Sequence, residues 1–322
     1  MLKKPNCPVI AIEEHYWDRE LSATYTGVEG VRNPEMMNRL FDLGDLRIKE
    51  MDEAGVDVQL ISHGAPSAQK LTTPDAVAMV RRVNDRLAAA IARHPTRFAG
   101  FATLPTSDPA AAADELERMV TEHGFKGAMI HGLANGVFLD DARFWPIFAR
   151  AEKLDVPIYL HPALPHPQVM EVYYKEYAKD FPMVIRAAWG FTVETATIAI
   201  RLVLSGLFEK HPRLKIVLGH LGETLPFLVW RIDQALSRPG TARPMHFRDI
   251  FCNNFWITTS GNFSNPALLC CAMEMGVDRI LFAIDWPFVP NPPGTRWMES
   301  VPLCDEDKAK ILSGNAKRLF RM

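Results

Sequence analysis

The sequence contains little cysteine and little unbalanced charge. Only five cysteines occur among 322 residues, and they show neither the spacing of a zinc site nor that of a redox pair. We interpret them as reduced packing residues, which fits a cytoplasmic protein. These cysteines are Cys7, Cys252, Cys270, Cys271 and Cys304.

A net charge of −2, without any run of lysine or arginine, predicts neither a nucleic-acid partner nor attachment to a membrane surface. No stretch of 18 or more apolar residues and no charged-then-apolar leader are present, so we expect a soluble protein that is not exported. The sequence also lacks a Gly-x-Ser-x-Gly elbow and a glycine loop that could cradle phosphate. It therefore gives no support to a serine hydrolase of that type or to a nucleotide-binding enzyme.

Eight short apolar runs, most of them followed by an amphipathic stretch, organise the chain. Their continuous apolarity predicts parallel strands that are buried on both faces. Eight strand–helix units in a chain of this length are typical of an α/β fold, the (β/α)8 TIM barrel. We therefore predict one domain over residues 1–322. The runs are Val9–Ile12, Val56–Ser62, Phe98–Thr103, Gly127–His131, Pro157–His161, Lys215–Gly219, Phe255–Thr259 and Ile280–Ile284.

Two connections are longer than ordinary loops. Residues 16–45 follow the first run, and residues 162–190 follow the fifth. Loops after the C-terminal ends of barrel strands build the active sites of this fold. We therefore expect both loop insertions to lie beside the functional site.

The ends of four runs carry residues that can bind metal. Glu13 and His15 are two apart, so on a strand both side chains point to one face and can share a divalent ion. His161, His220 and Asp285 end the fifth, sixth and eighth runs. Each residue alone could be a polar strand terminus, but the carboxyl ends of parallel barrel strands meet on one rim. Their joint occurrence at this rim favours a catalytic metal centre.

Several motifs together resemble the amidohydrolase-2 group, the relatives of aminocarboxymuconate-semialdehyde decarboxylase. Within it they are most similar to aromatic-acid decarboxylases that act on γ-resorcylate, 2,3-dihydroxybenzoate or 5-carboxyvanillate, and the γ-resorcylate enzymes are the nearest. The resemblance runs through almost the whole chain. The motifs are Glu13-Glu14-His15, Tyr159-Leu160-His161-Pro162, the stretch Leu218–Glu223, Thr258-Thr259-Ser260-Gly261-Asn262 and the stretch Leu281–Pro287.

This resemblance implies a fold like that of the metal-dependent hydrolases and one Mn²⁺ or Zn²⁺ ion held by Glu13, His15, His161 and Asp285. It also implies that His220 and Glu223 form a pair beside the metal. Hydrolytic relatives usually begin with His-x-His and often have a lysine at the end of the fourth strand, and neither is present here. Both differences favour carbon–carbon cleavage over hydrolysis.

The implied reaction is non-oxidative loss of CO₂ from an ortho-hydroxylated benzoate that is chelated to the metal. Asp285 is our candidate for the acid that protonates the ring carbon, and His220, oriented by Glu223, would manage its proton. Arg47 and Arg231 are candidates for contacts with the substrate's anionic groups. The resemblance further implies that Arg231 reaches the site of a neighbouring subunit in a homodimer or homotetramer.

Other substrate contacts follow from position after strand ends. Trp189, Phe191 and Phe288 could stack on the ring. His131 ends the fourth run, where the γ-resorcylate pattern has asparagine. The sequence therefore does not fix which substituents the substrate ring carries. Two alternatives remain: a metal-dependent hydrolase of a lactone or amide on the same barrel, and a metal-stabilised binding protein without turnover.

Overall fold

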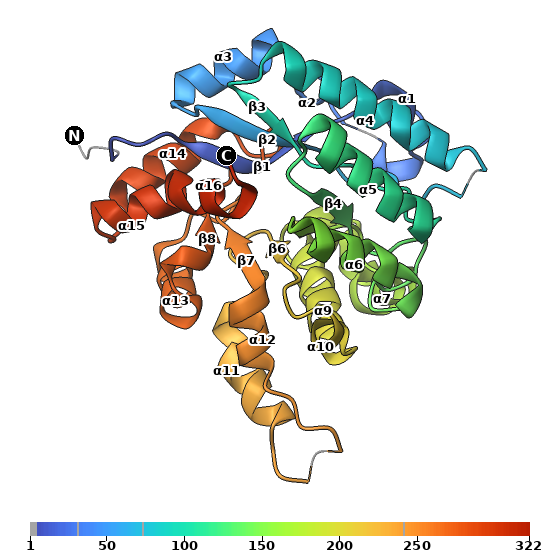
Figure 1. Ribbon diagram of the computed structural model, residues 1–322, viewed down its shortest axis with the longest axis vertical. Helices are drawn as coiled ribbons and strands as arrows, with labels where there is room; N and C mark the ends of the chain where they lie inside the picture. The colour runs from blue at the N-terminus through green and yellow to red at the C-terminus, as the bar shows by residue number, and fades with distance from the viewer. Residues whose placement is uncertain (1–4, 31, 73, 241) are drawn as a thin grey trace.

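The computed structural model describes residues 5–30, 32–72, 74–240 and 242–322. Eight parallel strands in these ranges form the centre of the molecule (Figure 1). They are β1 (Ile10–Tyr16), β2 (Val58–His63), β3 (Phe98–Gly100), β4 (Ala128–His131), β5 (Ile158–His161), β6 (Ile216–Leu218), β7 (Phe255–Thr258) and β8 (Ile280–Leu281).

The strands follow one another in sequence order around a closed barrel. Regular pairing gives one sheet of β1-β2-β3 and another of β4-β5-β6-β7-β8. A parallel bridge between Ala102 and Ala128 joins the two sheets on one side. On the other side the amide of Ile12 donates to the carbonyl of Phe282, at 3.2 Å. The predicted (β/α)8 barrel is therefore confirmed.

The strand boundaries differ from the predicted runs, most of all at the C-terminal ends of β1, β3 and β8. β1 continues through Tyr16, beyond the predicted apolar run, with an irregular register between Ala11 and Glu14. Buried polar side chains therefore occupy its end, which an apolar pattern cannot detect. β8 ends earlier than predicted because the amide of Phe282 donates to the carbonyl of Ile311, outside the sheet, at 3.0 Å.

Helices surround the barrel. Those that cover it between the strands are α3 (Asp45–Ala54), α4 (Ala76–Arg93), α5 (Pro109–His123), α6 (Trp145–Leu154), α9 (Gly190–Leu204), α10 (Leu207–Lys210), α11 (Leu225–Leu236), α12 (Phe247–Asn254) and α13 (Asn265–Met275). The last strand is followed by α14 (Asn291–Ser300), α15 (Asp305–Ala309), the π-helix η6 (Lys310–Gly314) and α16 (Asn315–Phe320). Short 3₁₀ turns are η2 (Ala142–Phe144) and η5 (Val277–Arg279).

Local sequence signals explain where helices begin and end. Asp108 accepts a hydrogen bond from the amide of Ala111 and so caps α5, as its place before Pro109 predicts. The apolar stretch 192–209 is divided into α9 and α10 because Gly206 has a left-handed φ of +87°. Thr73 precedes Pro74 in the same way and is predicted to cap a helix, but it lies outside the described residues.

The inside of the barrel and the layer under the helices form separate apolar clusters. Ile10 and Ile12 point into the barrel, whereas Val9 and Ala11 pack outward against helices. Leu319 and Phe320 of α16 belong to the inner cluster. The interior is therefore a packed core, and chemistry is confined to the opposite end, where β1 and β5 deliver polar residues.

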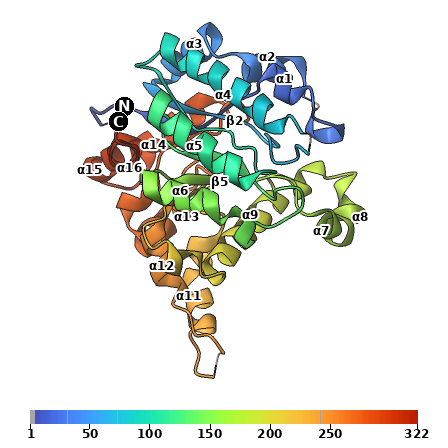
Figure 2. The ribbon, with the colours of Figure 1, turned by 45° about the vertical axis from the view of Figure 1, so that its right-hand side comes forward.

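Both loop insertions contain helices of their own. Residues 16–45 include α1 (Arg19–Ser22), η1 (Gly27–Glu29) and α2 (Pro34–Phe41). Residues 162–190 include α7 (Pro167–Val169), the π-helix η3 (Met170–Tyr174), α8 (Lys175–Ala178) and η4 (Pro182–Ile185). Figure 2 shows α7 and α8 projecting from one side, and α11 and α12 projecting at the bottom as a helical pair.

One helical stretch of the described chain, Pro182–Leu204, is long and apolar enough to cross a membrane by length and composition alone. It overlaps α9, and 44% of its most apolar window is buried inside the protein. Ile198 and Leu202 lie in the main apolar core. The stretch therefore has the packing of a core helix.

Candidate metal centre

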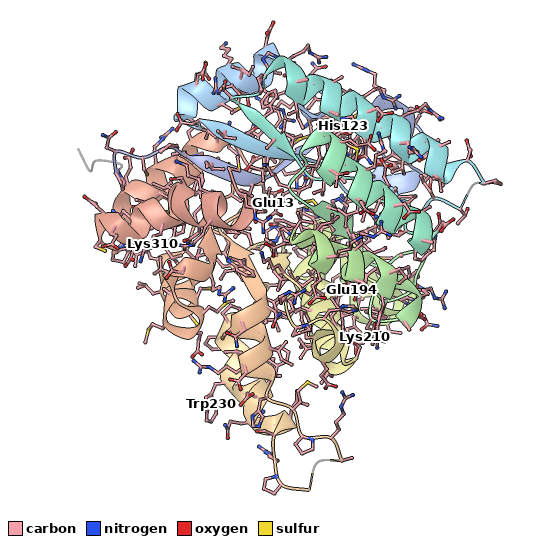
Figure 3. All side chains as sticks on the ribbon, viewed as in Figure 1. Glu13, His123, Glu194, Lys210, Trp230 and Lys310 are labelled. Carbon is pink, nitrogen blue, oxygen red and sulfur yellow. The ribbon has the colours of Figure 1, made fainter. Side chains whose placement is uncertain are left out.

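Four side chains from three strand ends converge at the centre of the molecule. Glu13 and His15 come from β1, His161 ends β5, and Asp285 follows β8. One ligand atom from each lies within 4.8 Å of all the others. His15 Nε2 is 3.3 Å from Asp285 Oδ1, and His161 Nε2 is 3.3 Å from Glu13 Oε1. Figure 3 shows the central position of Glu13.

This cluster fits a divalent metal ion. Glu13 Oε1, His15 Nε2 and Asp285 Oδ1 are buried atoms without a hydrogen-bond partner among the described residues. Buried polar atoms are normally paired, so these three facing one another mark a place for a ligand. Two carboxylates and two imidazoles suit zinc or manganese. Burial, followed by the charge of Arg47, lowers the pKa of His15 to about 3 and keeps its imidazole neutral, as ligation requires.

The second oxygen of Glu13 is held by hydroxyl groups. Glu13 Oε2 accepts hydrogen bonds from Tyr159, Thr258 and Ser260, which come from β5, β7 and the turn after β7. The carboxylate can therefore aim Oε1 at the ion. Gly219 makes room for it, because a Cβ there would lie 2.9 Å from Glu13 Oε2.

Hydrogen bonds also orient the two histidines. His15 Nδ1 lies 3.1 Å from Ser62 Oγ, and His161 Nδ1 lies 2.7 Å from the carbonyl of Pro162. His131 Nε2 lies 2.7 Å from the carbonyl of His63, so that nitrogen carries the proton and Nδ1 of His131 can accept. His131 Nδ1 is 2.9 Å from His161 Nδ1. This network assigns the proton of His161 to Nδ1 and leaves Nε2 free for metal.

The position of His131 differs from the predicted substrate contact. Its side chain is 1% exposed and lies behind His161. It does not line the cavity beside the metal ligands. The structure therefore makes His131 a support for a ligand, because β4 and β5 pair His131 with His161 in register.

His220 and Glu223 form the expected pair. His220 Nδ1 is 2.7 Å from Glu223 Oε1, and His220 Nε2 is 3.9 Å from Asp285 Oδ2. All five residues 220–224 have left-handed backbone conformations, which curl the chain enough to bring the two side chains together. Burial opposes a charge on His220, but the carboxylates of Glu223 and Glu13 outweigh it and raise the pKa of His220 well above its usual value.

Glu14 is a supporting residue that the sequence analysis did not identify. Its side chain is fully buried, and its two oxygens accept from the amides of Ile284 and Trp286, each at 3.0 Å. These amides flank Asp285, whose φ is +77°. Burial raises the pKa of Glu14 well above its usual value, with the two amides and Arg47 opposing that rise. Glu14 thus holds the turn that presents Asp285.

Arg47 does not reach the cavity, contrary to the prediction. Its guanidinium is fully buried and stacks on Trp286, with Cζ 4.0 Å from the ring centroid. It donates to the carbonyl of His15 at 2.6 Å and to Gln59 Oε1 at 3.1 Å. An amphipathic helix pattern suggests an exposed arginine, but α3 places this one under the end of β1.

A cavity of about 300 Å³ adjoins the metal ligands. Its lining combines three site residues with apolar groups and two arginines that sequence reasoning missed, because both lie in the irregular loop insertions. The lining residues are Arg32, Ala65, His161, Met183, Arg186, Ala187, Phe191, Thr192, His220, Asp285 and Phe288.

The remaining predicted substrate contacts lie in different places. Phe288 lines the cavity, and its ring centroid is 5.7 Å from that of His15. Trp189 is 51% exposed and lines a neighbouring groove instead. Arg231 is exposed on α11, next to Trp230, which Figure 3 shows on the projecting helical pair, far from Glu13. Within one chain, therefore, Arg231 does not reach the cavity.

Comparison with known proteins gives full-length matches. The family model described as Amidohydrolase matches residues 10–322. The chain is 40% identical to a γ-resorcylate decarboxylase of Rhizobium sp. (strain MTP-10005) over 327 residues, covering 97% of this chain and 98% of the relative.

Two solved structures extend this comparison. A dihydroxybenzoic acid decarboxylase from Polaromonas sp. JS666, with manganese and the inhibitor 2-nitroresorcinol, has a TM-score of 0.90 at 41% identity, over 98% of this chain and 97% of that one. A 5-carboxyvanillate decarboxylase from Novosphingobium aromaticivorans, with manganese and 4-hydroxy-3-methoxy-5-nitrobenzoic acid, has a TM-score of 0.91 at 30% identity, over 100% and 99%.

Proposed function

Because the chain belongs to the Amidohydrolase family, we propose that it is a metal-dependent carboxy-lyase that removes CO₂ from an ortho-hydroxylated benzoate. One observation carries this proposal: two carboxylates and two histidines bring one ligand atom each within 4.8 Å of one another, beside a cavity of the size of a single aromatic ring. Three of these four atoms are buried without a hydrogen-bond partner among the described residues. The decarboxylases named above match 97% or more of the chain, and the two solved structures among them contain manganese.

The four clustered residues would hold the ion. Glu13, His15, His161 and Asp285 supply the donor atoms. When bound, Mn²⁺ or Zn²⁺ would stabilise negative charge on the substrate's carboxylate and ortho oxygen.

Asp285 is our candidate for the residue that moves the proton. Its Oδ1 faces the ligand cluster, and its Oδ2 lies 3.9 Å from His220 Nε2 at the cavity wall. We assign Asp285 the role of protonating the ring carbon that bears the carboxylate, with His220 and Glu223 returning the proton. The carbon gains H⁺ and loses CO₂, and the electrons of the broken bond restore the aromatic ring. The step balances without an oxidant or an organic cofactor.

A homo-oligomer would complete the site. Phe227 and Trp230 are 80% and 65% exposed on α11, so this projecting helix presents large apolar side chains next to Arg231. Such exposure is typical of a covered interface. We infer that α11 packs on a second copy of the chain, in a dimer or tetramer, and that Arg231 reaches the partner's cavity.

The whole chain is one catalytic unit in this proposal, because both loop insertions contribute residues to the cavity wall. Its five cysteines are all free, which agrees with a cytoplasmic location.

The direct test is CO₂ release by protein that has been stripped of metal and reloaded with Mn²⁺ or Zn²⁺. The substrates are 2,6-dihydroxybenzoate, 2,3-dihydroxybenzoate, 5-carboxyvanillate and a set of lactones and amides. We expect CO₂ and loss of the acid's ultraviolet absorbance, both abolished by a chelator. Hydrolysis of a lactone or amide without CO₂ release would favour the hydrolase alternative, and tight binding without turnover would favour a binding protein.

A further inference from the structure

A second cavity lies at the end of the barrel opposite the metal ligands, and we call it the basal cavity. Its volume is about 610 Å³. Lys215 directly precedes β6, Trp256 lies at the beginning of β7, and Arg279 directly precedes β8, and all three line the cavity together with α16. The strands begin here and end at the metal centre, so none of the four metal ligands is among the described lining residues.

The basal cavity has an excess of positive charge. Cations and carboxylates among the described lining residues are Arg213, Lys215, Arg279 and Arg318 against Asp155 and Asp278. Both carboxylates are also shared with cations outside the lining, because Arg321 pairs with Asp155 and Lys310 with Asp278. The excess of two cations in the lining matches the charge of a bound dianion.

Arg279 lines this cavity without a carboxylate partner. Its guanidinium stacks on Trp256, with Cζ 4.1 Å from the ring centroid. Its Nη1 is buried and has no hydrogen-bond partner among the described residues. By contrast, Lys215 pairs with Asp155 at 2.5 Å, and Arg318 pairs with a second carboxylate at 2.9 Å. Buried polar groups are normally paired, so Arg279 lacks an acceptor that a ligand can supply.

The cations of the basal cavity act on one another. Burial, and then the charge of Arg279, lowers the pKa of Lys215. Burial also lowers the pKa of Arg279, and the charge of Arg318 adds to this effect, whereas Cys252 and Asp278 oppose it. The three cationic groups are thus close enough to repel one another, and an anion among them would relieve that repulsion.

We propose that Arg279, Lys215 and Arg318 form a binding site for a phosphate-type dianion at the N-terminal end of the barrel. Leu214 and Leu319 also line the cavity, which is larger than an inorganic phosphate, so an organic group attached to the phosphate has apolar walls to contact. A bound dianion would link the beginnings of β6 and β8 to α16. Its effect should therefore be stabilisation of the fold, independent of the proposed decarboxylation.

Calorimetric titration of the Mn²⁺-loaded protein with inorganic phosphate and with phenyl phosphate tests the site. The titration is made at about pH 8, where phosphate is mainly dianionic. We expect saturable binding and a melting temperature that rises by about 2 °C or more at saturation. Potassium chloride at the same ionic strength should give neither. Tighter binding of phenyl phosphate would assign the site to an organic phosphate, and otherwise the ligand is inorganic phosphate.

Two comparisons place the bound phosphate away from the metal. Protein stripped of metal should bind phosphate with an affinity within threefold of that of the Mn²⁺-loaded protein, because the basal cavity contains no metal ligand. Phosphate at saturation should leave Mn²⁺ bound to the protein.

Variants then assign the binding to the cations. Arg279→Gln and Lys215→Gln should each lower affinity for phosphate roughly 10- to 100-fold, because each removes a charged donor. Arg279→Lys should retain part of the affinity. Arg93→Gln replaces an exposed arginine at the end of α4 and should retain all of it. Circular dichroism reports folding in each variant.

Three results would overturn the proposal. They are equal effects of phosphate and chloride on the melting temperature, phosphate binding that requires Mn²⁺, and unchanged phosphate affinity in both Gln variants of the basal cavity. Each result is read from binding or unfolding alone, so the proposal can fail even if CO₂ is released from hydroxybenzoates, and can hold if it is not.

Discussion

Glu14→Gln tests how the barrel presents Asp285, the proposed acid. The two oxygens of Glu14 accept from the amides of Ile284 and Trp286, on either side of Asp285. Glutamine has the same shape but only one acceptor oxygen, so its NH₂ group would face a backbone N–H. One buried hydrogen bond is lost and one amide is left unpaired.

The size of the effect follows from these contacts. Losing one buried hydrogen bond of this kind costs about 1–3 kcal/mol. The lost hydrogen bond lies in the turn that holds Asp285 at a left-handed φ of +77°. We therefore expect the side chain of Asp285 to be displaced as well as the protein to be destabilised. Displaced supports of metal ligands typically cost about 10- to 100-fold in metal affinity or activity. We expect a loss of that order in Mn²⁺ affinity and in kcat.

The assay combines three measurements on the variant: urea unfolding, Mn²⁺ affinity by competition with a chelator, and kcat with saturating metal. Glu50→Gln is the matched control, because Glu50 accepts from the indole of Trp286 at 2.7 Å without touching the amides beside Asp285. Its Mn²⁺ affinity should change less than threefold. If Glu14→Gln loses stability yet keeps wild-type Mn²⁺ affinity and kcat, the argument that Glu14 positions Asp285 is wrong.

Three further substitutions test other parts of the site. Asp285→Asn should reduce decarboxylation at least about 10³-fold while leaving the circular dichroism spectrum unchanged, because it removes the proton donor; substantial turnover would exclude Asp285 as the acid. Arg231→Ala should be inactive alone and regain part of its activity when mixed with Asp285→Asn, since mixed oligomers contain one intact site; verified mixed oligomers without recovery would contradict sharing between chains. Asp18→Asn should lose about 1–2 kcal/mol of unfolding free energy at neutral pH, because Asp18 caps α1 and pairs with Arg86 at 2.7 Å. Burial raises the pKa of Asp18, but hydrogen bonds from Arg86 and the amide of Leu21 lower it overall, so its contribution exists above about pH 4 and is lost as pH falls through the folded value. Urea titrations should therefore show wild type and variant converging at low pH, and a constant difference would refute the linkage.

The barrel could be predicted because its strands are buried on both faces and leave continuous apolar runs. Failures occur where the chain departs from that regularity. β1 extends through Tyr16 although its end carries Glu13 and His15. These polar groups can be buried because groups from other strands hydrogen-bond to them. No local sequence pattern reveals such distant partners.

Position at a strand end made Glu13, His15, His161, His220 and Asp285 candidates for a metal centre, and the resemblance to the amidohydrolase-2 group separated the four ligands from His220. Arg47 shows the limit of this reasoning. The sequence made it a candidate for contact with the substrate's anionic groups, but the fold buries it beneath His15 and Trp286, where its charge helps to keep His15 neutral. A charged residue on an amphipathic helix has no sequence signal that distinguishes the two places.

Substrate recognition was the least predictable part, because it depends on chain segments without a regular repeat. Arg32 and Arg186 are more than 150 positions apart and meet only because both loop insertions cover the same end of the barrel. The metal ligands are tied to strand ends, whereas these arginines are tied to the insertions and line the cavity beside the ligands. If that division holds, replacing Arg32 and Arg186 should change the preferred benzoate while leaving Mn²⁺ affinity within threefold of the wild type. A parallel fall in Mn²⁺ affinity would show instead that the insertions help to build the metal centre itself.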